Sequence, residues 1–543
     1  MDDQYLNMEK IQIYDTTLRD GSQGENISFS VDDKLHIARK LDDLGVDYIE
    51  GGWPGSNLKD MAFFHRISEL PLKNAKVAAF GSTCHPKNTV TQDSNLQALV
   101  HANTPVVTIF GKSWDLHVKV ALGVTLEKNL ELIRDSVAYL KSLGKEVIYD
   151  AEHFFDGFHA DTEYALATLS AAEQAGANTV VLCDTNGGTL TEDIRDRMLK
   201  VSYHMKGPLG IHTHNDSDMA VANSIIALRH GARHVQGTIN GYGERCGNAN
   251  LCSIIPNIEL KLGMKAIGKE RLSQLTEVSR YVSEIANLSH RQDLPFVGKS
   301  AFAHKGGIHV SAVMKESSAY EHVQPEVVGN ERRVLISELS GKSNVLYKAE
   351  RMGLSIDKSS IRTQVVVNKL KEMEHYGYQF EGAEASFEIL FNKLLEQHRE
   401  FFELDGFRVI TEKRGNLEST SEAVIKLRVE GIEEHTAAEG VGPVSALDHA
   451  LRKSLTTFFP CIKDIRLTDY KVRVLNVKGG TDAKVRVLIE SSDGQESWGT
   501  VGVSENLIEA SWLALVDSIS YKLKKEYGAR VQLDQAKLRQ EGS

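Results

Sequence analysis

Hydrophobic positions in the first half of the chain recur in short runs that alternate with longer amphipathic segments. The runs are rich in β-branched and aromatic residues, as buried strands are, and the segments carry apolar residues at helical spacing. The runs lie at residues 11–16, 48–52, 76–82, 106–112, 146–153, 179–186, 209–215 and 234–241. Eight βα units in succession predict an α/β fold of the (β/α)₈ TIM-barrel type.

The first amphipathic segment carries a full set of helix signals. Ser30 and Asp33 form a predicted capping box, positions 35, 38, 41 and 44 are apolar, and Gly45 follows as a terminator. A doubly wound open sheet is the alternative arrangement of such βα units. It is disfavoured because no Gly-x-Gly-x-x-Gly motif follows the first run.

The pattern changes beyond residue 265, so we assign the barrel to residues 1–265. Helical periodicity then predicts linker subdomains over residues 266–404, with a polar cluster that contains His304, Lys305 and His309. Alternating runs at residues 423–430, 470–476 and 483–490, with helical segments at 444–459 and 505–524, predict a separate C-terminal α+β domain over residues 405–530. Residues 531–543 are expected to form a polar tail.

Charge, the lengths of apolar runs and the cysteine pattern argue against several classes of protein. The net charge of −11 over 543 residues argues against nucleic acid or an anionic membrane as the main partner. No apolar run reaches the length of a membrane span, and the N-terminus lacks the features of a signal peptide. The five cysteines are scattered and include no CxxC pair, which argues against a disulfide framework. We therefore expect a cytoplasmic protein.

Chemistry in a barrel of this type gathers at the carboxyl ends of the strands. The first run is followed by Arg19, Asp20 and Gln23, and the seventh contains His212 and His214. Alternate residues of a strand face the same side, so the two imidazoles project together. One carboxylate with two imidazoles is a usual ligand set for Zn²⁺, Mn²⁺ or Fe²⁺. The alternative is two unrelated polar strand ends.

The other strand ends are also polar or rich in glycine, which packing alone does not require. The second run ends in Glu50-Gly-Gly-Trp-Pro-Gly-Ser, the fifth in Asp150-Ala-Glu152-His153, and the sixth in Asp184-Thr185-Asn186-Gly-Gly. The eighth ends in a loop that reaches Asn248 and includes Cys246, which we interpret as a small packing residue. Phe80 and Phe110, on the third and fourth runs, are candidates to shorten a pocket there, but the sequence does not orient them.

Four motifs give the chain a family resemblance. They are Asp-Thr-Thr-Leu-Arg-Asp-Gly-x-Gln at residues 15–23, His-Thr-His-Asn-Asp at 212–216, Asn-Gly-x-Gly-Glu-Arg-x-Gly-Asn at 240–248 and Gly-Ile-His at 307–309. The chain resembles the metal-dependent acyltransferases that condense acetyl-CoA with a 2-oxo acid, namely the isopropylmalate, homocitrate and citramalate synthases. The resemblance covers nearly the whole chain, and residues 48–57 look most like the long-chain citramalate synthases.

The resemblance implies roles for particular residues. Asp20, His212 and His214 would hold a divalent metal ion (zinc, manganese or magnesium), with Asn248 as a further oxygen ligand. Arg19 would lie against the keto oxygen of the substrate, Gln23 and Thr185 would bind the substrate, and Glu152 would lie at the reacting carbons. His309 and Tyr320 would reach into the site of the neighbouring subunit of a homodimer.

The same residues have plainer interpretations. Glu152 could be a charge at the start of a helix, His309 a solvated loop residue and Tyr320 a packing aromatic. The chemistry nevertheless agrees with the resemblance. A metal ion polarises the keto group, Arg19 adds a fixed positive charge, and a base such as His309 or Glu152 takes a proton from the methyl group of acetyl-CoA.

The resemblance implies a condensation of acetyl-CoA with pyruvate that yields citramalate and CoA in isoleucine biosynthesis. Isoleucine is then the expected feedback inhibitor, bound by the C-terminal domain. One alternative is a 2-isopropylmalate synthase, which accepts 2-oxoisovalerate and senses leucine. More distant alternatives are a retro-aldol lyase of the HMG-CoA type, a biotin-dependent carboxyltransferase subunit and a non-catalytic ligand sensor.

Overall fold

The computed structural model describes residues 10–335, 361–380, 382–394, 400–416, 418–475 and 483–541. The chain forms two compact units, and each is described by itself. The first comprises Met1–Phe302 with Glu321–Arg332, and the second comprises Ala303–Tyr320 with Arg333–Ser543.

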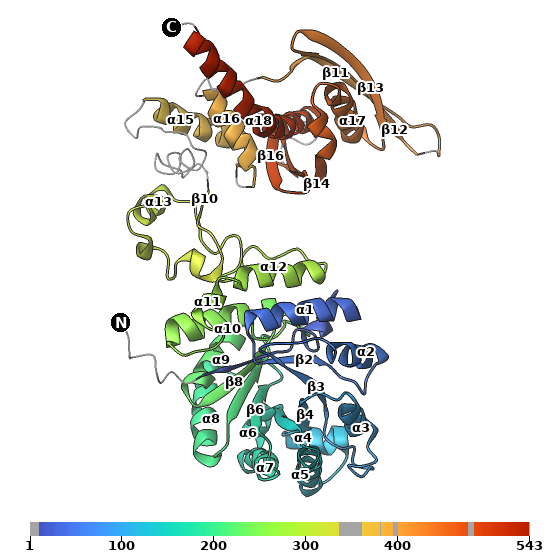
Figure 1. Cartoon of the computed structure of the whole chain (residues 1–543), viewed down its shortest axis with the longest axis vertical. Coiled ribbons are helices and arrows are strands. Elements are labelled where there is room, and N and C mark those ends of the chain that lie inside the picture. Colours follow the sequence, from blue (N-terminus) through green and yellow to red (C-terminus); the bar gives the residue numbers. More distant parts are fainter. Residues whose placement is uncertain are drawn as a thin grey trace. The chain divides into compact units, whose positions relative to one another are not determined.

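The first unit is built on a closed barrel of eight parallel strands in chain order, which confirms the predicted fold (Figure 1). The strands are β1 (Gln12–Asp15), β2 (Tyr48–Gly52), β3 (Lys76–Ser82), β4 (Val106–Lys112), β5 (Glu146–Glu152), β6 (Thr179–Asp184), β7 (Leu209–Thr213) and β8 (Ala232–Gly237). Strand β1 pairs with both β2 and β8, and this pairing closes the barrel. The eighth strand begins two residues earlier than predicted, and the chain turns after Gly237 into a short 3-10 turn, η4 (Ile239–Gly241).

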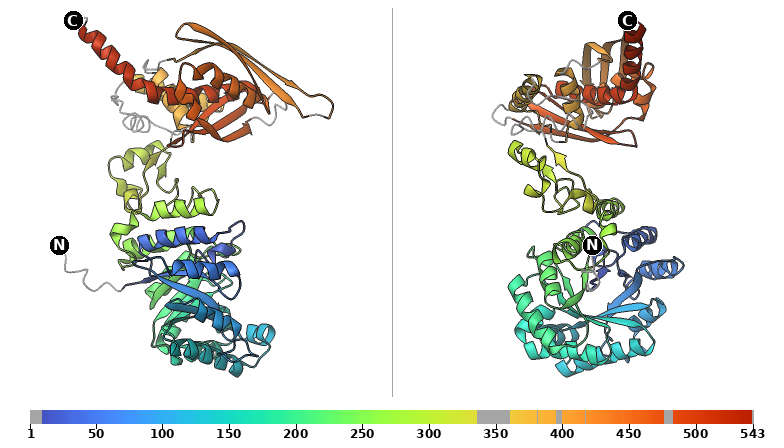
Figure 2. Two further views of the ribbon diagram at one scale, coloured as in Figure 1. Left: turned by 45° about the vertical axis from the view of Figure 1, so that its right-hand side comes forward. Right: turned by 60° about the vertical axis from the view of Figure 1, so that its left-hand side comes forward.

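Helices connect the strands and surround them (Figure 2). The main ones are α1 (Val31–Leu44), α2 (Leu58–Ile67), α3 (Ser94–His101), α5 (Leu126–Ser142), α7 (Thr162–Gln174), α8 (Thr191–His204), α9 (Ala220–Arg229) and α10 (Leu251–Asn257). Helix α1 begins with the predicted capping box, in which Ser30 and Asp33 bond each other's backbone N–H groups. It ends at Gly45, whose φ of 90° is the left-handed conformation that favours glycine.

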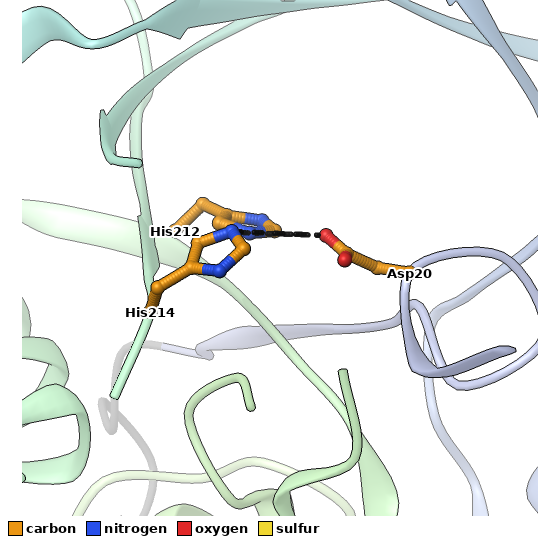
Figure 3. A group of neighbouring side chains, drawn as sticks. All are labelled: Asp20, His212 and His214. Carbon is orange, nitrogen blue, oxygen red and sulfur yellow. Dashed lines mark hydrogen bonds and ion pairs between the residues drawn. The ribbon is translucent and has the colours of Figure 1, made fainter. Parts of the chain in front are cut away.

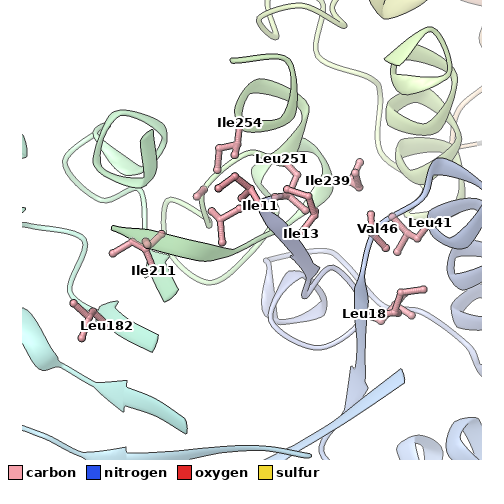
Figure 4. Close-up of a cluster of buried hydrophobic side chains, with 14 of the residues drawn as sticks. Ile11, Ile13, Leu18, Leu41, Val46, Leu182, Ile211, Ile239, Leu251 and Ile254 are labelled. Carbon is pink, nitrogen blue, oxygen red and sulfur yellow. The ribbon is translucent and has the colours of Figure 1, made fainter. Parts of the chain in front are cut away.

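Apolar packing lies mainly between the strands and the helices around them. Figure 4 shows part of this core, with Ile11 and Ile13 from the start of the barrel beside Leu251 and Ile254 of α10. The barrel interior holds a smaller apolar cluster, made up of Tyr14, Tyr48, Ala78, Val106, Ile148, Val181 and Cys183. Many of the other interior side chains are polar, and they include residues of the site described below.

The second unit contains two three-stranded antiparallel sheets, each followed by a helix. The first sheet is formed by β11 (Glu403–Glu412), β12 (Thr420–Val429) and β13 (Ile432–Gly440), and α17 (Pro443–Thr456) packs on it. The second is formed by β14 (Arg466–Val474), β15 (Val485–Ser492) and β16 (Ser497–Ser504), and α18 (Leu507–Glu541) packs on it. The predicted α+β class is confirmed, and helix α18 includes residues 531–541, where the sequence suggested a polar tail.

Three of these six strands were not predicted. Strands β11 and β13 have no fully buried position, and their apolar residues do not alternate regularly with polar ones. Strand β16 contains Gly499 and Gly502, which ordinarily weaken a strand. An added Cβ would lie 1.7 Å from the Gly382 carbonyl oxygen at Gly499 and 2.0 Å from that of Ala510 at Gly502. Close backbone approach therefore requires both glycines.

The predicted linker region is mostly helical. It contains α11 (Lys269–Leu272), α12 (Leu275–Ile285), α13 (Gly307–Val313), α15 (Ile361–Tyr376) and α16 (Glu384–Leu394), together with a parallel pair of two-residue strands, β9 (Ala303–His304) and β10 (Arg333–Val334). Residues 355–360, which the sequence predicted as helical, lie outside the described residues. The domain limits at residues 265 and 404 stay predictions. Within the described part of the chain, the helices are all too short or too polar to cross a membrane.

Candidate functional site

Three buried side chains meet at the carboxyl end of the barrel. Asp20 lies in the turn after β1, His212 lies in β7 and His214 directly follows it (Figure 3). The Asp20 Oδ2 atom is 3.4 Å from His212 Nε2 and 4.0 Å from His214 Nε2, and the two Nε2 atoms are 3.3 Å apart. One ligand atom from each residue lies within 4.8 Å of the others. This arrangement can hold a metal ion, because three donor atoms converge on one point.

Asn248 lies beside this cluster, since its backbone forms an isolated bridge with that of His214. The Asn248 amide nitrogen donates to the Tyr242 carbonyl oxygen at 3.2 Å. Its Oδ1 atom is buried and has no hydrogen-bond partner among the described residues. A buried oxygen without a partner fits a further ligand to a cation.

Arg19 places a buried positive charge beside Asp20. Its Nε atom donates to Glu50 Oε1 at 2.6 Å, and another of its nitrogens lies 3.3 Å from Asp20 Oδ2. The planar guanidinium is 3.7 Å from the centroid of the Phe80 ring. The sequence named Glu50 only as a polar strand end and did not pair it with Arg19.

Glu50 is fully buried and is held by three donors. Besides Arg19, the hydroxyls of Tyr14 and Thr16 each donate to it at 2.5 Å. Burial lowers the pKa of Arg19, but Glu50 and Asp20 outweigh this effect and raise it above its ordinary value. Burial likewise raises the pKa of Asp20, but Arg19 and the neighbouring His212 outweigh it and hold that pKa well below its ordinary value. Both charges are therefore present at neutral pH.

A cavity of about 220 Å³ opens at this cluster. It is lined by Arg19, Asp20, Gln23, Trp53, Phe80, Phe110, Asp150, Glu152, Cys183, Thr185, His212, His214, Glu244 and Arg245. All of the predicted site residues of the barrel except Asn248 are among them. Burial raises the pKa of Asp150 to about 7, so this carboxyl group titrates near neutral pH.

One wall of the cavity is aromatic. The Phe80 and Phe110 rings stack with centroids 5.5 Å apart, and the Trp53 ring meets both edge-on at 5.8 and 5.6 Å. The Trp53 indole N–H donates to Asn95 Oδ1 at 2.7 Å, which fixes the ring. The wall was not predictable in this form, because Trp53 comes from a loop whose direction the sequence does not indicate.

Thr185 and Glu152 enter the cavity from neighbouring strand ends. The His153 backbone N–H donates to Thr185 Oγ1 at 2.9 Å, so the Thr185 hydroxyl proton is available to a different acceptor. Glu152 forms an ion pair with Lys112, its register partner on β4. The sequence gave Lys112 no role. The Glu152 carboxylate is therefore engaged in an ion pair at the wall of the cavity.

His309 and Tyr320 belong to the second unit, whereas the residues above belong to the first. Their rings lie together, with centroids 4.4 Å apart and an interplanar angle of 32°. Both side chains are exposed. Cys246 is also exposed, so its interpretation as a packing residue was wrong, since the glycine-rich loop after β8 turns it outward.

Three protein-family models match the chain. The model described as HMGL-like matches residues 10–282, which include the whole barrel. A model described as homocitrate synthase post-HMGL domain-like matches residues 296–377. The LeuA allosteric (dimerisation) domain matches residues 381–523.

Curated relatives match along almost the full length. The "(R)-citramalate synthase" of Aquifex aeolicus is 56% identical over 520 residues, covering 95% of this chain and 98% of that protein. The protein of the same name from Sulfolobus acidocaldarius is 47% identical, with 95% and 98% coverage. The "2-isopropylmalate synthase" of Methanocaldococcus jannaschii is 30% identical, covering 95% of each chain.

Proposed function

The chain belongs to the (R)-citramalate synthases within the HMGL-like family, and from this premise we propose that it condenses acetyl-CoA with pyruvate. Hydrolysis of the thioester then gives citramalate and free CoA, a step of isoleucine biosynthesis. The observation that carries the proposal is the cavity in which Arg19 and the cluster of Asp20, His212 and His214 face an aromatic wall. Charge at one end suits a 2-oxo acid, and aromatic rings suit its alkyl group.

We assign the metal ligands as Asp20, His212 and His214, with Asn248 as a fourth. A divalent cation bound there (zinc, manganese or magnesium) supplies Lewis-acid polarisation of the keto group. The two imidazoles favour zinc or manganese over magnesium, which prefers oxygen ligands.

The 2-oxo acid is held by residues of the barrel. Arg19 donates to the keto oxygen as negative charge develops there, and Glu50 keeps the guanidinium in place for this contact. Thr185 donates its hydroxyl proton to the substrate carboxylate, and Gln23 adds an amide contact. These donors are in place before the reaction begins. They therefore lower the free energy of the transition state without any reorganisation of the site.

The proton of the acetyl-CoA methyl group needs a base. Glu152 is paired with Lys112, so we assign the base to His309, which takes the proton as the methyl carbon bonds to the keto carbon of pyruvate. Tyr320 packs on the His309 ring and orients it. Glu152 then acts as a carboxylate beside the reacting carbons. The LeuA dimerisation domain supports a homodimer in which His309 and Tyr320 serve the site of the partner subunit.

The choice of pyruvate follows from the aromatic wall. Trp53, Phe80 and Phe110 take up space that the isopropyl group of 2-oxoisovalerate needs, whereas the methyl group of pyruvate is small. A hydrophobic pocket discriminates against each extra methylene group by about 1–3 kcal/mol. The alternative activity, 2-isopropylmalate synthesis, has weaker support, since the relative of that name is 30% identical.

Release of CoA thiol from acetyl-CoA tests the function directly. With Mn²⁺ present, the kcat/KM for pyruvate should exceed that for 2-oxobutyrate by at least about 10-fold and that for 2-oxoisovalerate by about 100-fold. These ratios follow from the discrimination per extra carbon given above. Phe80→Ala should reduce both ratios, because it removes part of the aromatic wall. Phe63 is buried but does not line the cavity, so Phe63→Ala is the control. A preference for 2-oxoisovalerate would assign isopropylmalate synthesis, and cleavage of HMG-CoA would assign the lyase.

Hybrid dimers test the role of His309 and Tyr320 across subunits. His309→Ala and Asp20→Ala proteins should each be inactive alone. Mixing them under conditions of subunit exchange should restore about a quarter of wild-type activity, because random pairing places one intact site in half of the dimers. If exchange occurs and activity stays absent, His309 does not act in the partner's site.

Calorimetric titration of the full-length enzyme tests regulation. We expect isoleucine to bind and to inhibit the enzyme. The coupling free energy between isoleucine binding and substrate binding should be about 1–3 kcal/mol. Asp20→Asn protein should bind isoleucine with unchanged affinity, because we assign the effector site to the LeuA domain and not to the metal ligands. Binding of leucine alone would favour isopropylmalate synthesis, and loss of isoleucine binding in Asp20→Asn would place the effector in the barrel.

A further inference from the structure

Gln236 of β8 lies between His212 of β7 and Asp150 of β5, inside the barrel. Its side chain is fully buried. The Gln236 Oε1 atom is 2.7 Å from His212 Nδ1, and its Nε2 atom is 3.0 Å from Asp150 Oδ1. His212 and Gln236 are partners in the parallel register of β7 and β8, so their side chains leave the sheet side by side.

The chemistry of the neighbours orients the Gln236 amide. At pH 8, above its pKa of about 7, Asp150 is mostly ionised and accepts hydrogen bonds only, so it selects the NH₂ group of Gln236. The His234 Nε2 atom lies on the same side, 3.5 Å from Gln236 Nε2. Burial lowers the pKa of His234 to about 3, so this imidazole is neutral and can accept. The carbonyl oxygen of Gln236 is thereby turned towards His212.

The orientation of Gln236 decides which His212 nitrogen carries the proton. A carbonyl oxygen only accepts, so His212 Nδ1 must donate. A neutral imidazole has one N–H group, and the lone pair therefore lies on Nε2. His212 Nε2 is the atom that faces Asp20 at 3.4 Å.

His214 has no comparable support. Its Nδ1 atom is buried without a hydrogen-bond partner among the described residues. From the residues that the structure describes, no hydrogen bond to that nitrogen selects the tautomer of His214, whereas the contact of Gln236 with Nδ1 selects the tautomer of His212.

We propose that Gln236 is a positioning residue for His212, and that Asp150 orients Gln236 so that His212 presents Nε2 as a metal ligand. This inference rests on the proposed metal site. Without Gln236, His212 Nδ1–H loses its acceptor, and the ring can adopt the other tautomer, which has no lone pair at Nε2. Loss of such a partner typically weakens metal binding by about 10–100-fold.

Titration with Mn²⁺, followed by the electron paramagnetic resonance signal of the free ion at pH 8, measures this effect without relying on activity. Gln236→Leu should weaken Mn²⁺ binding by about 10–100-fold. Gln12→Leu is the matched control, because Gln12 also lies in a barrel strand and its side chain donates to the Tyr48 hydroxyl at 3.2 Å, away from the metal ligands. It should leave Mn²⁺ affinity within about twofold, while circular dichroism melting reports the stability of each variant.

Exchanging the amide and the carboxylate between Gln236 and Asp150 tests the direction of their hydrogen bonds. It also provides a test if Gln236→Leu fails to fold. Gln236→Glu keeps the side-chain volume but places a carboxylate against Asp150, so Mn²⁺ binding should weaken. Adding Asp150→Asn gives the new carboxylate an amide donor while it still accepts from His212. The double variant should therefore bind Mn²⁺ within about threefold of the wild type.

His212→Ala separates the two proposals. If His212→Ala loses Mn²⁺ binding while Gln236→Leu stays within about twofold of the wild type, the positioning role is wrong and the metal site stands. Failure of the double variant to recover affinity also overturns the positioning role. If His212→Ala binds Mn²⁺ as the wild type does, the metal site itself is wrong.

Discussion

The buried ion pair between Arg19 and Glu50 is the interaction on which the site depends. A guanidinium inside a barrel is costly unless a paired and hydrogen-bonded anion accompanies it. Glu50 meets this requirement because it accepts from Arg19, Tyr14 and Thr16 at once. The pair therefore allows a permanent positive charge to lie beside Asp20, at the wall of the cavity, before any substrate binds.

The need to pair and hydrogen-bond buried charges also shapes the rest of the barrel interior. Interior positions that other barrels fill with aliphatic side chains carry Glu50, Asp150 and Gln236, each held by hydrogen bonds. The apolar core lies instead between the strands and the surrounding helices, and stability is supplied there. Removing one partner of a buried pair typically costs about 3–5 kcal/mol, so the network is sensitive to single substitutions.

The barrel and the three central ligand candidates were predictable because their signals are local. Each βα unit shows its own periodicity, and His212 and His214 share a face through the period of a strand. The partners of those residues were not predictable, since Glu50 and Gln236 meet Arg19 and His212 only after the barrel closes. Strands β11 and β13 were missed for a different reason, because their apolar residues are irregularly spaced and none of their positions is fully buried.

Replacement of Arg19 by lysine tests most directly whether the fixed guanidinium drives the chemistry. Lysine keeps the charge, but its single ammonium group cannot hold Glu50 and reach the keto oxygen in the same fork geometry. With pyruvate and Mn²⁺ saturating, we expect kcat to fall by about 10²-fold or more, as on removal of an oxyanion donor, while Mn²⁺ affinity is kept. A loss of less than about fivefold would contradict the account, because an oxyanion donor is worth far more than that.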